Sequence, residues 1–133
     1  MKPFFYLITG LLALQSVSTH ADVATDLLAE YAAEAQENFS VAKGEVFWSR
    51  SFPDPKSDQQ RSCATCHTSN LEQMGKHART GKKIEPMAPS ANPKRLSDAG
   101  KIEKWFKRNC KWTLGRECTP QEKGDLLVFI NSR

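Results

Sequence analysis

The motif "CATCH", Cys63 to His67, is the feature that most limits what this chain can fold into. Two cysteines separated by two residues and followed directly by a histidine form the attachment motif of c-type haem. The thiols of Cys63 and Cys66 would add to the two vinyl groups, and His67 would bind the iron from the same side as proximal ligand. One turn of chain must therefore reach both vinyl groups and the metal together.

Other interpretations of the motif agree less well with the rest of the chain. A thioredoxin-like dithiol needs a βαβ context, and the sequence shows no parallel strands. A zinc site would need a second ligand pair, but Cys110 and Cys118 are too widely spaced for the usual zinc knuckle. Four cysteines in an exported chain would otherwise suggest two disulfides. We therefore expect one covalently bound haem c, with chance occurrence of the pattern as the remaining alternative.

Residues 1–21 have the layout of a secretory signal peptide. One lysine precedes an apolar run from Pro3 to Leu14, and small polar residues lead to Ala21, after which we expect cleavage. An uncleaved membrane anchor is the alternative, although the run is shorter than the roughly 20 residues of a bilayer span. Residues 22–133 would form one cytochrome c domain in the periplasm. Export and the small net charge of +4 argue against a nucleic-acid partner.

The spacing of apolar residues predicts an all-α domain with long loops and no strand of useful length. Helices are expected from residue 23 to about 37, from a Ser40 cap to about residue 49, after a Ser97 cap, and after a Thr119 cap. Loops are expected over residues 51–60 and 68–95, which contain several prolines and glycines. The predicted buried side chains of the second and last helices are Val41, Phe47, Trp48, Leu126, Leu127, Phe129 and Ile130.

Gly44 precedes Phe47 by three residues, as in the N-terminal helix of small monohaem cytochromes c. There the glycine allows a close crossing with the C-terminal helix, whose counterpart here is "GDLLVFI". This similarity implies a small class I-like cytochrome c fold, with three to five helices around one covalent haem.

An amide interrupts the apolar stripe of the helix that contains "KIEKWFKRNCKW". Ile102, Trp105 and Phe106 share one face, and the next position on that face is Asn109. A buried amide must find partners or cost roughly 1–3 kcal/mol. Iron can be such a partner, since a carboxamide oxygen donates a lone pair. The alternative is that Asn109 ends the helix and bonds to backbone.

Met87 is the second candidate for the sixth ligand, because it follows a proline in the loop "IEPMAPS", as in electron-transfer cytochromes. It lies only 20 residues past His67, which is a short route to the opposite face of a haem. Packing against the porphyrin edge is the alternative. Met74 and His77 are closer still to His67, and we expect them at the surface.

From Cys63 to its C-terminus the chain closely resembles the sphaeroides haem protein family, which consists of exported monohaem c-type cytochromes with asparagine ligation. The matching stretches are "SCATCH", "RTGKKIEPMAPSANPKR", "IEKWFKRNC", "GREC" and "TPQEKGDLL". Ordinary cytochromes c share only the first of these, so the set is specific. Met87 is a departure, because leucine is usual there, and it keeps thioether ligation open. The N-terminal third matches only in pattern.

The resemblance implies a role for each matched residue. His67 would be the proximal ligand and Asn109 the sixth ligand of ferric haem, while Cys110 and Cys118 would form a disulfide. An amide oxygen is a hard, weak donor that suits Fe(III) better than Fe(II), so reduction should release it. O2, CO or NO would then bind in a distal pocket shaped by Trp105 and the displaced amide. A haem oxidoreductase of the nitric oxide dioxygenase type is the enzymatic hypothesis.

Partners follow from the same resemblance, which implies a dihaem cytochrome c and a membrane b-type cytochrome as electron donors to a monomer or weak dimer. A basic helix face would either be solvated or steer an acidic donor; it comprises Lys101, Lys104, Lys107, Arg108 and Lys111. Candidates for the haem propionates are Arg79, Lys82 and Lys83. The competing functions are a plain electron carrier with Met87 as ligand and, more weakly, a haem-based sensor.

Overall fold

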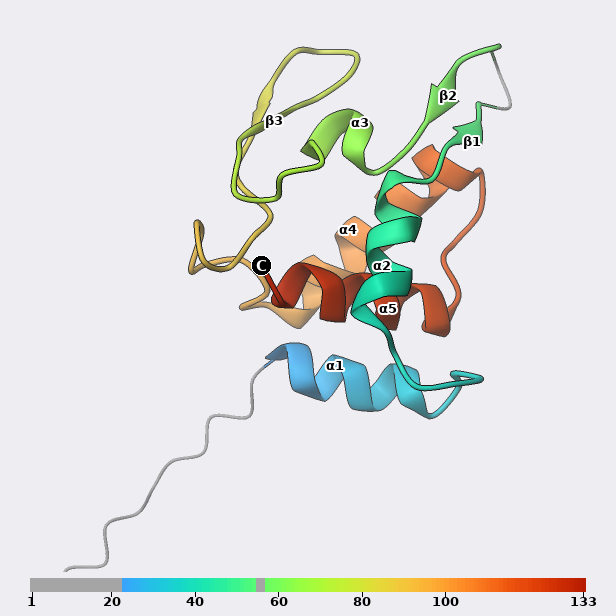
Figure 1. Ribbon diagram of the computed structural model, residues 1–133, viewed down its shortest axis with the longest axis vertical. Helices are drawn as coiled ribbons and strands as arrows, with labels where there is room; N and C mark the ends of the chain where they lie inside the picture. The colour runs from blue at the N-terminus through green and yellow to red at the C-terminus, as the bar shows by residue number, and fades with distance from the viewer. Residues whose placement is uncertain (1–22, 55–56) are drawn as a thin grey trace, which may run out of the picture.

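The computed structural model describes residues 23–54 and 57–133 (Figure 1). These residues contain five helices and four two-residue strands. The helices are α1 (Val23–Ala32), α2 (Val41–Ser49), α3 (Ala64–His67), α4 (Ala99–Leu114) and α5 (Pro120–Asn131). The strands are β1 (Phe52–Pro53), β2 (Gln60–Arg61), β3 (Gly75–Lys76) and β4 (Lys83–Ile84). The signal peptide predicted for residues 1–21 lies outside the described residues.

The strands form two antiparallel pairs, β1 with β2 and β3 with β4, inside segments predicted to be loops. Pairs of two residues are too short to show an alternating pattern, so these strands could not be predicted from the spacing of apolar residues. The predicted all-α class is confirmed, because the helices form the packed core. None of the helices in the described ranges is both long and apolar enough to span a membrane.

The crossing of α2 and α5 is the central contact of the fold, as Figure 1 shows. A Cβ atom on Gly44 would lie 2.1 Å from the carbonyl oxygen of Asp125 and 2.6 Å from the Cβ of Phe129. Such distances leave no room for a side chain, so the predicted role of Gly44 is confirmed. The Asp125 carboxylate also accepts a 2.7 Å hydrogen bond from the backbone N–H of Ser40, which holds the start of α2 on α5.

Two groups of buried side chains fill the core. The larger joins α2, α4, α5 and the loop after α3, and it consists of Trp48, Leu71, Ala88, Cys110, Cys118, Leu126, Phe129 and Ile130. The smaller attaches α1 through Ala24, Leu27, Tyr31 and Leu127. Burial of Trp48 and of the four predicted residues of α5 is confirmed.

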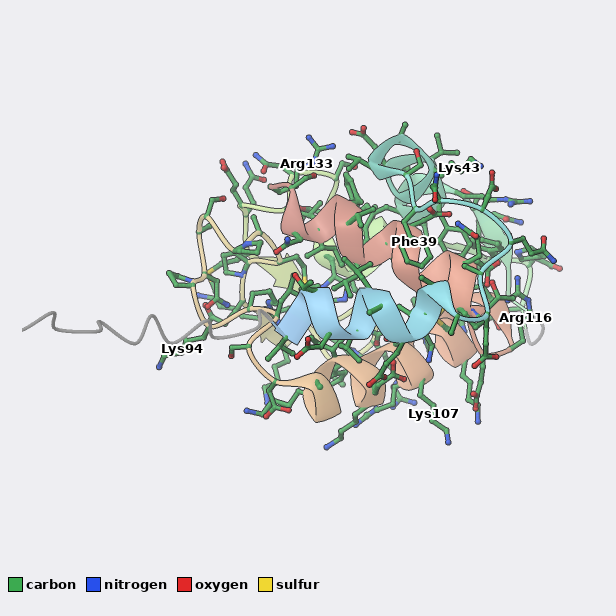
Figure 2. The ribbon with its side chains drawn as sticks, turned by 90° about the horizontal axis from the view of Figure 1, so that it is seen from below. Phe39, Lys43, Lys94, Lys107, Arg116 and Arg133 are labelled. Atoms are coloured by element: carbon green, nitrogen blue, oxygen red, sulfur yellow. A yellow bond between two sulfur atoms is a disulfide. The ribbon has the colours of Figure 1, made fainter. Side chains whose placement is uncertain are left out.

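Val41 was predicted to be buried, but it is 40% exposed. Phe39, just before the helix, packs on Gly124 instead and covers that end of α5 (Figure 2). The first helix is also shorter than predicted and ends at Ala32. No large apolar side chain follows Tyr31 to hold another turn against the core.

The helix caps agree with prediction at two of three positions. Ser40 caps α2 by accepting from the N–H of Lys43, and Thr119 with Glu122 forms the predicted capping box of α5. The cap of α4 is Asp98 rather than Ser97: its carboxylate accepts from the N–H of Lys101 at 2.9 Å. The Ser97 hydroxyl instead donates to the carbonyl of Lys94 at 2.8 Å.

Candidate functional site

The five residues of "CATCH" form a single helical turn. Cys63 has helical backbone angles directly before α3, and the N–H of His67 donates to its carbonyl oxygen at 3.1 Å. Ser62 and Thr65 start this turn by exchanging side-chain-to-backbone hydrogen bonds of 2.9 and 3.2 Å. The thiols of Cys63 and Cys66 are both free, although their spacing would allow a disulfide. The turn therefore presents two thiols and one imidazole together.

Burial keeps Cys63 and His67 uncharged at neutral pH. Burial raises the pKa of the Cys63 thiol to about 12. It also lowers the pKa of His67 to about 4, with a smaller contribution from the positive charge of Arg95. The Nδ1 atom of His67 is buried and has no hydrogen-bond partner among the described residues. A neutral imidazole with an unpaired nitrogen beside two free thiols fits the donor set of a covalently attached haem.

Neighbouring residues hold the turn in place. The Nε1 atom of Trp48 donates to the carbonyl of Thr68 at 2.8 Å, and its ring centroid lies 5.6 Å from that of His67. Gly75 in β3 passes so close that a Cβ atom there would lie 2.1 Å from the carbonyl oxygen of Cys66. The turn is therefore packed against α2 on one side and β3 on another.

Helix α4 contains the predicted distal residues. Its most buried face runs through Cys110 and Thr113, and Asn109 lies beside this face, partly exposed. The Asn109 amide forms no hydrogen bond with any residue that the structure describes. Trp105 was predicted to lie on the apolar stripe, but it is 48% exposed, and the guanidinium of Arg108 lies 5.0 Å from its ring centroid.

A disulfide joins Cys110 to Cys118, with a Cα–Cα distance of 5.6 Å. Both cysteines are buried in the larger core group. Cys110 directly follows Asn109, and Cys118 lies just before α5. The bond therefore fixes the part of α4 that contains Asn109 to the beginning of the last helix.

Met87 lies on the segment that follows the cysteine–histidine turn. The backbone N–H groups of Met87 and Ala88 both donate to the carbonyl of Leu71, at 2.9 Å each. Leu71 is a buried core residue only four positions after His67. The backbone of Met87 is therefore bound to chain that leaves the proximal side.

Two arginines that the sequence analysis did not single out are partly buried: Arg95 beside the segment before Met87, and Arg61 beside α4. Arg95 donates to the carbonyl oxygens of Glu85 and Pro86 at 2.9 to 3.0 Å, which fixes the segment before Met87. Arg61 contacts α4 from β2. By contrast, the residues suggested for propionate binding, Arg79, Lys82 and Lys83, are all exposed. The chain has 19 lysines and arginines, and no local sequence pattern distinguishes Arg61 and Arg95 from the others.

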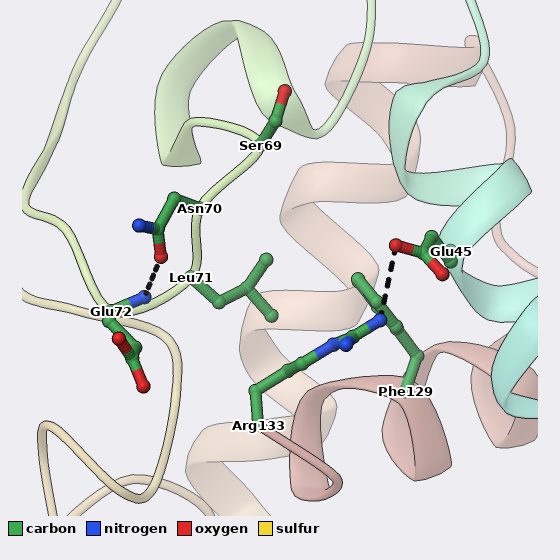
Figure 3. Close-up of a pocket in the computed structure, with 7 residues that line it drawn as sticks. All are labelled: Glu45, Ser69, Asn70, Leu71, Glu72, Phe129 and Arg133. Atoms are coloured by element: carbon green, nitrogen blue, oxygen red, sulfur yellow. Dashed lines mark hydrogen bonds and ion pairs between the residues drawn. The ribbon is translucent and has the colours of Figure 1, made fainter.

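A cavity of about 360 Å³ opens between α2, α5 and the loop after α3 (Figure 3). An ion pair of 3.1 Å between Arg133 and Glu45 lies across it. Its lining residues are Glu45, Ser69, Asn70, Leu71, Glu72, Phe129 and Arg133. It contains none of the predicted haem residues and does not fit a role in holding the haem.

Most of the chain is similar in sequence to a family model and to two known cytochromes. Residues 34–130 match the family model described as a domain of unknown function, DUF1924. The chain is 37% identical over 126 residues to the cytochrome c-type protein SHP of Cereibacter sphaeroides, covering 95% of each protein. It is 40% identical over 91 residues to cytochrome c'' of Methylophilus methylotrophus, covering 68% of this chain and 62% of that one.

Solved structures of the same two proteins are similar in fold. The structure of oxidized SHP, described as an oxygen binding cytochrome c, matches with a TM-score of 0.74 and 38% identity, over 83% of this chain and 96% of that one. The crystal structure of oxidized cytochrome c'' matches with a TM-score of 0.72 and 36% identity, over 81% and 92%. The fold is therefore that of a small class I-like cytochrome c.

Proposed function

The chain belongs to the sphaeroides haem protein family, and on that premise we propose that it is a monohaem c-type cytochrome whose distal ligand, Asn109, is released on reduction. Haem c, when bound, supplies two axial iron positions, a ferric–ferrous change and affinity for O2, NO and CO. The protein's part is to hold the haem, to occupy the distal position in one redox state and to vacate it in the other.

The cysteine–histidine turn supplies the proximal attachment. Cys63 and Cys66 are free thiols on one helical turn, which suits addition to two vinyl groups on one edge of a porphyrin. His67 is neutral and partly buried, so a ring nitrogen has a lone pair available at physiological pH. Packing of Trp48 and Gly75 around the turn keeps the imidazole in a fixed orientation.

The observation that carries the proposal is the unpaired amide of Asn109. It lies beside the buried face of α4, next to the disulfide, and forms no hydrogen bond with another described residue. The amide has no protein partner among the described residues and its polar atoms are not sealed from solvent, so its oxygen is available to bind a metal. Its hard oxygen binds Fe(III) more strongly than Fe(II), so the amide should leave on reduction and open the position to a gas.

The position of Met87 supports asparagine rather than thioether ligation. Its backbone is bound to Leu71, on the chain that leaves the proximal turn, and residues 85 and 86 are fixed by Arg95. Because His67 would hold a haem from this part of the chain, the second protein ligand would have to come from another part of the fold. Packing against the haem edge is therefore the role that we assign to Met87.

Gas binding and electron supply complete the proposal. The relative SHP is described as oxygen binding, which supports O2 as a ligand here. One electron, one NO and one O2 together make nitrate, and a haem-containing protein that bound O2 could take part in this reaction if a partner supplied the electron. We assign the supply of electrons to a dihaem cytochrome c and a membrane b-type cytochrome. We place this protein itself in the periplasm. The exposed cations of α4 are suited to meeting an acidic donor.

Optical spectra of the haem-bearing protein test the proposal. We expect a six-coordinate ferric form, a five-coordinate high-spin ferrous form, and rapid CO binding after reduction. A low-spin ferrous spectrum with no CO reaction would show that the distal ligand stays bound, and the protein would then be an electron carrier. Formation of nitrate from NO by the oxygenated protein tests turnover separately.

A further inference from the structure

Arg61 links the segment that leads into the cysteine–histidine turn to helix α4. It lies in β2, two residues before Cys63, so its backbone leads directly into the cysteine–histidine turn. Its Nη1 group donates to the carbonyl oxygen of Trp112 at 2.9 Å, and its Cζ atom lies 4.4 Å from the centroid of the Trp112 ring. Trp112 is three residues after Asn109 on α4.

The contact with α4 satisfies a group that the helix itself leaves unpaired. Trp112 is among the last four residues of α4, whose carbonyl groups have no partner within the helix. A guanidinium there also complements the partial negative charge of the helix C-terminus. Arg61 therefore holds the end of α4 through a charged hydrogen bond and a stacked ring together.

A buried carboxylate fixes the guanidinium itself. Asp54 is only 7% exposed and pairs with the Nη2 group of Arg61. Asp54 and Arg61 lie at the paired β1–β2 strands, where Phe52 is opposite Arg61. Because the guanidinium is held by Asp54 on one side and by Trp112 on the other, it cannot rotate freely between positions. Its place is set by the fold rather than by solvent.

Other described contacts of α4 lead to different parts of the molecule. The disulfide connects α4 to the chain before α5, and Glu103 contacts Lys123 of α5 and Tyr31 of α1. Arg61 connects α4 to the segment that contains the proximal attachment. We propose that Arg61 is a positioning residue that sets the place of Asn109 relative to the cysteine–histidine turn, and so the strength with which the amide holds ferric iron.

This inference rests on the proposed function, because it assumes that Asn109 is the ferric ligand. Loss of the Arg61 contact would let the end of α4 move relative to the attached haem. The amide would then occupy the iron for a smaller fraction of time, and an external anion would bind faster. The ferrous protein would be unaffected, because its amide has already left.

Stopped-flow binding of azide to the ferric haem-bearing protein measures this effect in Arg61→Met and Arg61→Lys. We expect Arg61→Met to bind azide at least about fivefold faster, with more high-spin ferric protein. Arg61→Lys keeps the charge but not the forked geometry, so its rate should lie between those of Arg61→Met and wild type. CO binding to the ferrous forms should be unchanged. The matched control is Arg116→Met, which removes an arginine whose exposed ion pair with Glu122 lies at the start of α5.

Asn109→Ala, measured in parallel, separates the two proposals. If it speeds azide binding while both Arg61 variants behave as wild type, the role of Arg61 is overturned and the proposed function stands. If Asn109→Ala leaves the ferric spectrum and the azide rate unchanged, the proposed function is wrong, and the role of Arg61 with it. Should Arg61→Met fail to fold, Asp54→Asn takes its place, and wild-type rates in both Asp54→Asn and Arg61→Lys would overturn the inference.

Discussion

The proximal side of the proposed site consists of five consecutive residues in one helical turn, whereas the distal side depends on a helix held by distant parts of the chain. Cys63, Cys66 and His67 receive their relative positions from local backbone hydrogen bonds. The position of α4 depends on Tyr31, Arg61 and Lys123, which lie in three other elements. Substitutions in the first region should act in an all-or-none manner, and those in the second should have graded effects.

Removing the attachment thiols should have the largest effect. In Cys63→Ala/Cys66→Ala no thiol remains to react with the vinyl groups, so covalent haem should be lost completely. Haem staining after denaturing electrophoresis measures this. The control is Cys110→Ala/Cys118→Ala, which should retain the stain. Haem that stays attached in the first variant would contradict the local assignment.

Replacement of the distal amide should change the ferric state while the haem stays attached. In Asn109→Ala the ferric spectrum should become high-spin, and azide or cyanide should bind faster because no tethered ligand competes. The ferrous spectrum should barely change. Met87→Leu should alter neither state. The assignment of the ligand is wrong if Met87→Leu abolishes a low-spin spectrum and Asn109→Ala leaves it intact.

The disulfide should matter less, and mainly for stability. Loss of the bond in Cys110→Ala/Cys118→Ala should lower the free energy of unfolding by about 2.5 kcal/mol, as chain entropy predicts for a short loop. Denaturant titration of the haem-bearing protein measures the loss. Wild-type protein should contain no thiol that an alkylating reagent can modify, and two such thiols would refute the pairing.

The smallest effect should come from the contacts of Glu103. Burial raises the pKa of this carboxyl, but hydrogen bonds from Lys123 and Tyr31 outweigh burial and hold it below its ordinary value of 4.5. A carboxylate with a lowered pKa stabilises the folded state above its ordinary pKa, and this contribution is lost as the pH falls. Glu103→Gln should therefore lower stability by about 1 kcal/mol at pH 7.

The pH dependence gives that prediction its control. As the pH falls below 4.5, wild type should lose the contribution of Glu103, and its stability should approach that of Glu103→Gln. Thermal unfolding of both proteins between pH 7 and pH 3 measures the difference. A difference that stayed constant across this range would show that the carboxylate charge is not what holds α4 to α1 and α5.

The features that were predictable from sequence are those set by neighbouring residues. The Ser40 and Thr119 caps each depend on a side chain that accepts from the backbone N–H three residues later, and Gly44 needs only the approach of one helix. The cap of α4 was misplaced by one residue because Leu96 has a positive φ of 62°, which redirects the chain before Asp98. No periodic pattern reports such a turn.

The distal side of the site was harder to predict from sequence, because it depends on contacts between distant parts of the chain. Spacing placed Trp105 with Ile102 and Phe106, but the buried face of α4 is centred nearer Cys110, which leaves Trp105 at its edge. The position of that face depends on which elements pack against α4. Likewise, the role of Arg61 appears only when β2 and the end of α4 lie side by side. Spacing made Asn109 a candidate ligand, and the family resemblance favoured it over the alternatives.

The two cysteine pairs have a consequence for how the cell must assemble this protein. Cys110 and Cys118 must lose electrons to form their bond, whereas Cys63 and Cys66 must keep their hydrogens until they add to the vinyl groups. The maturing chain therefore needs an oxidant for one pair and a reductant for the other. Production with the oxidant alone should yield haem-free chains that contain a second disulfide, which intact-mass measurement before and after reduction would reveal.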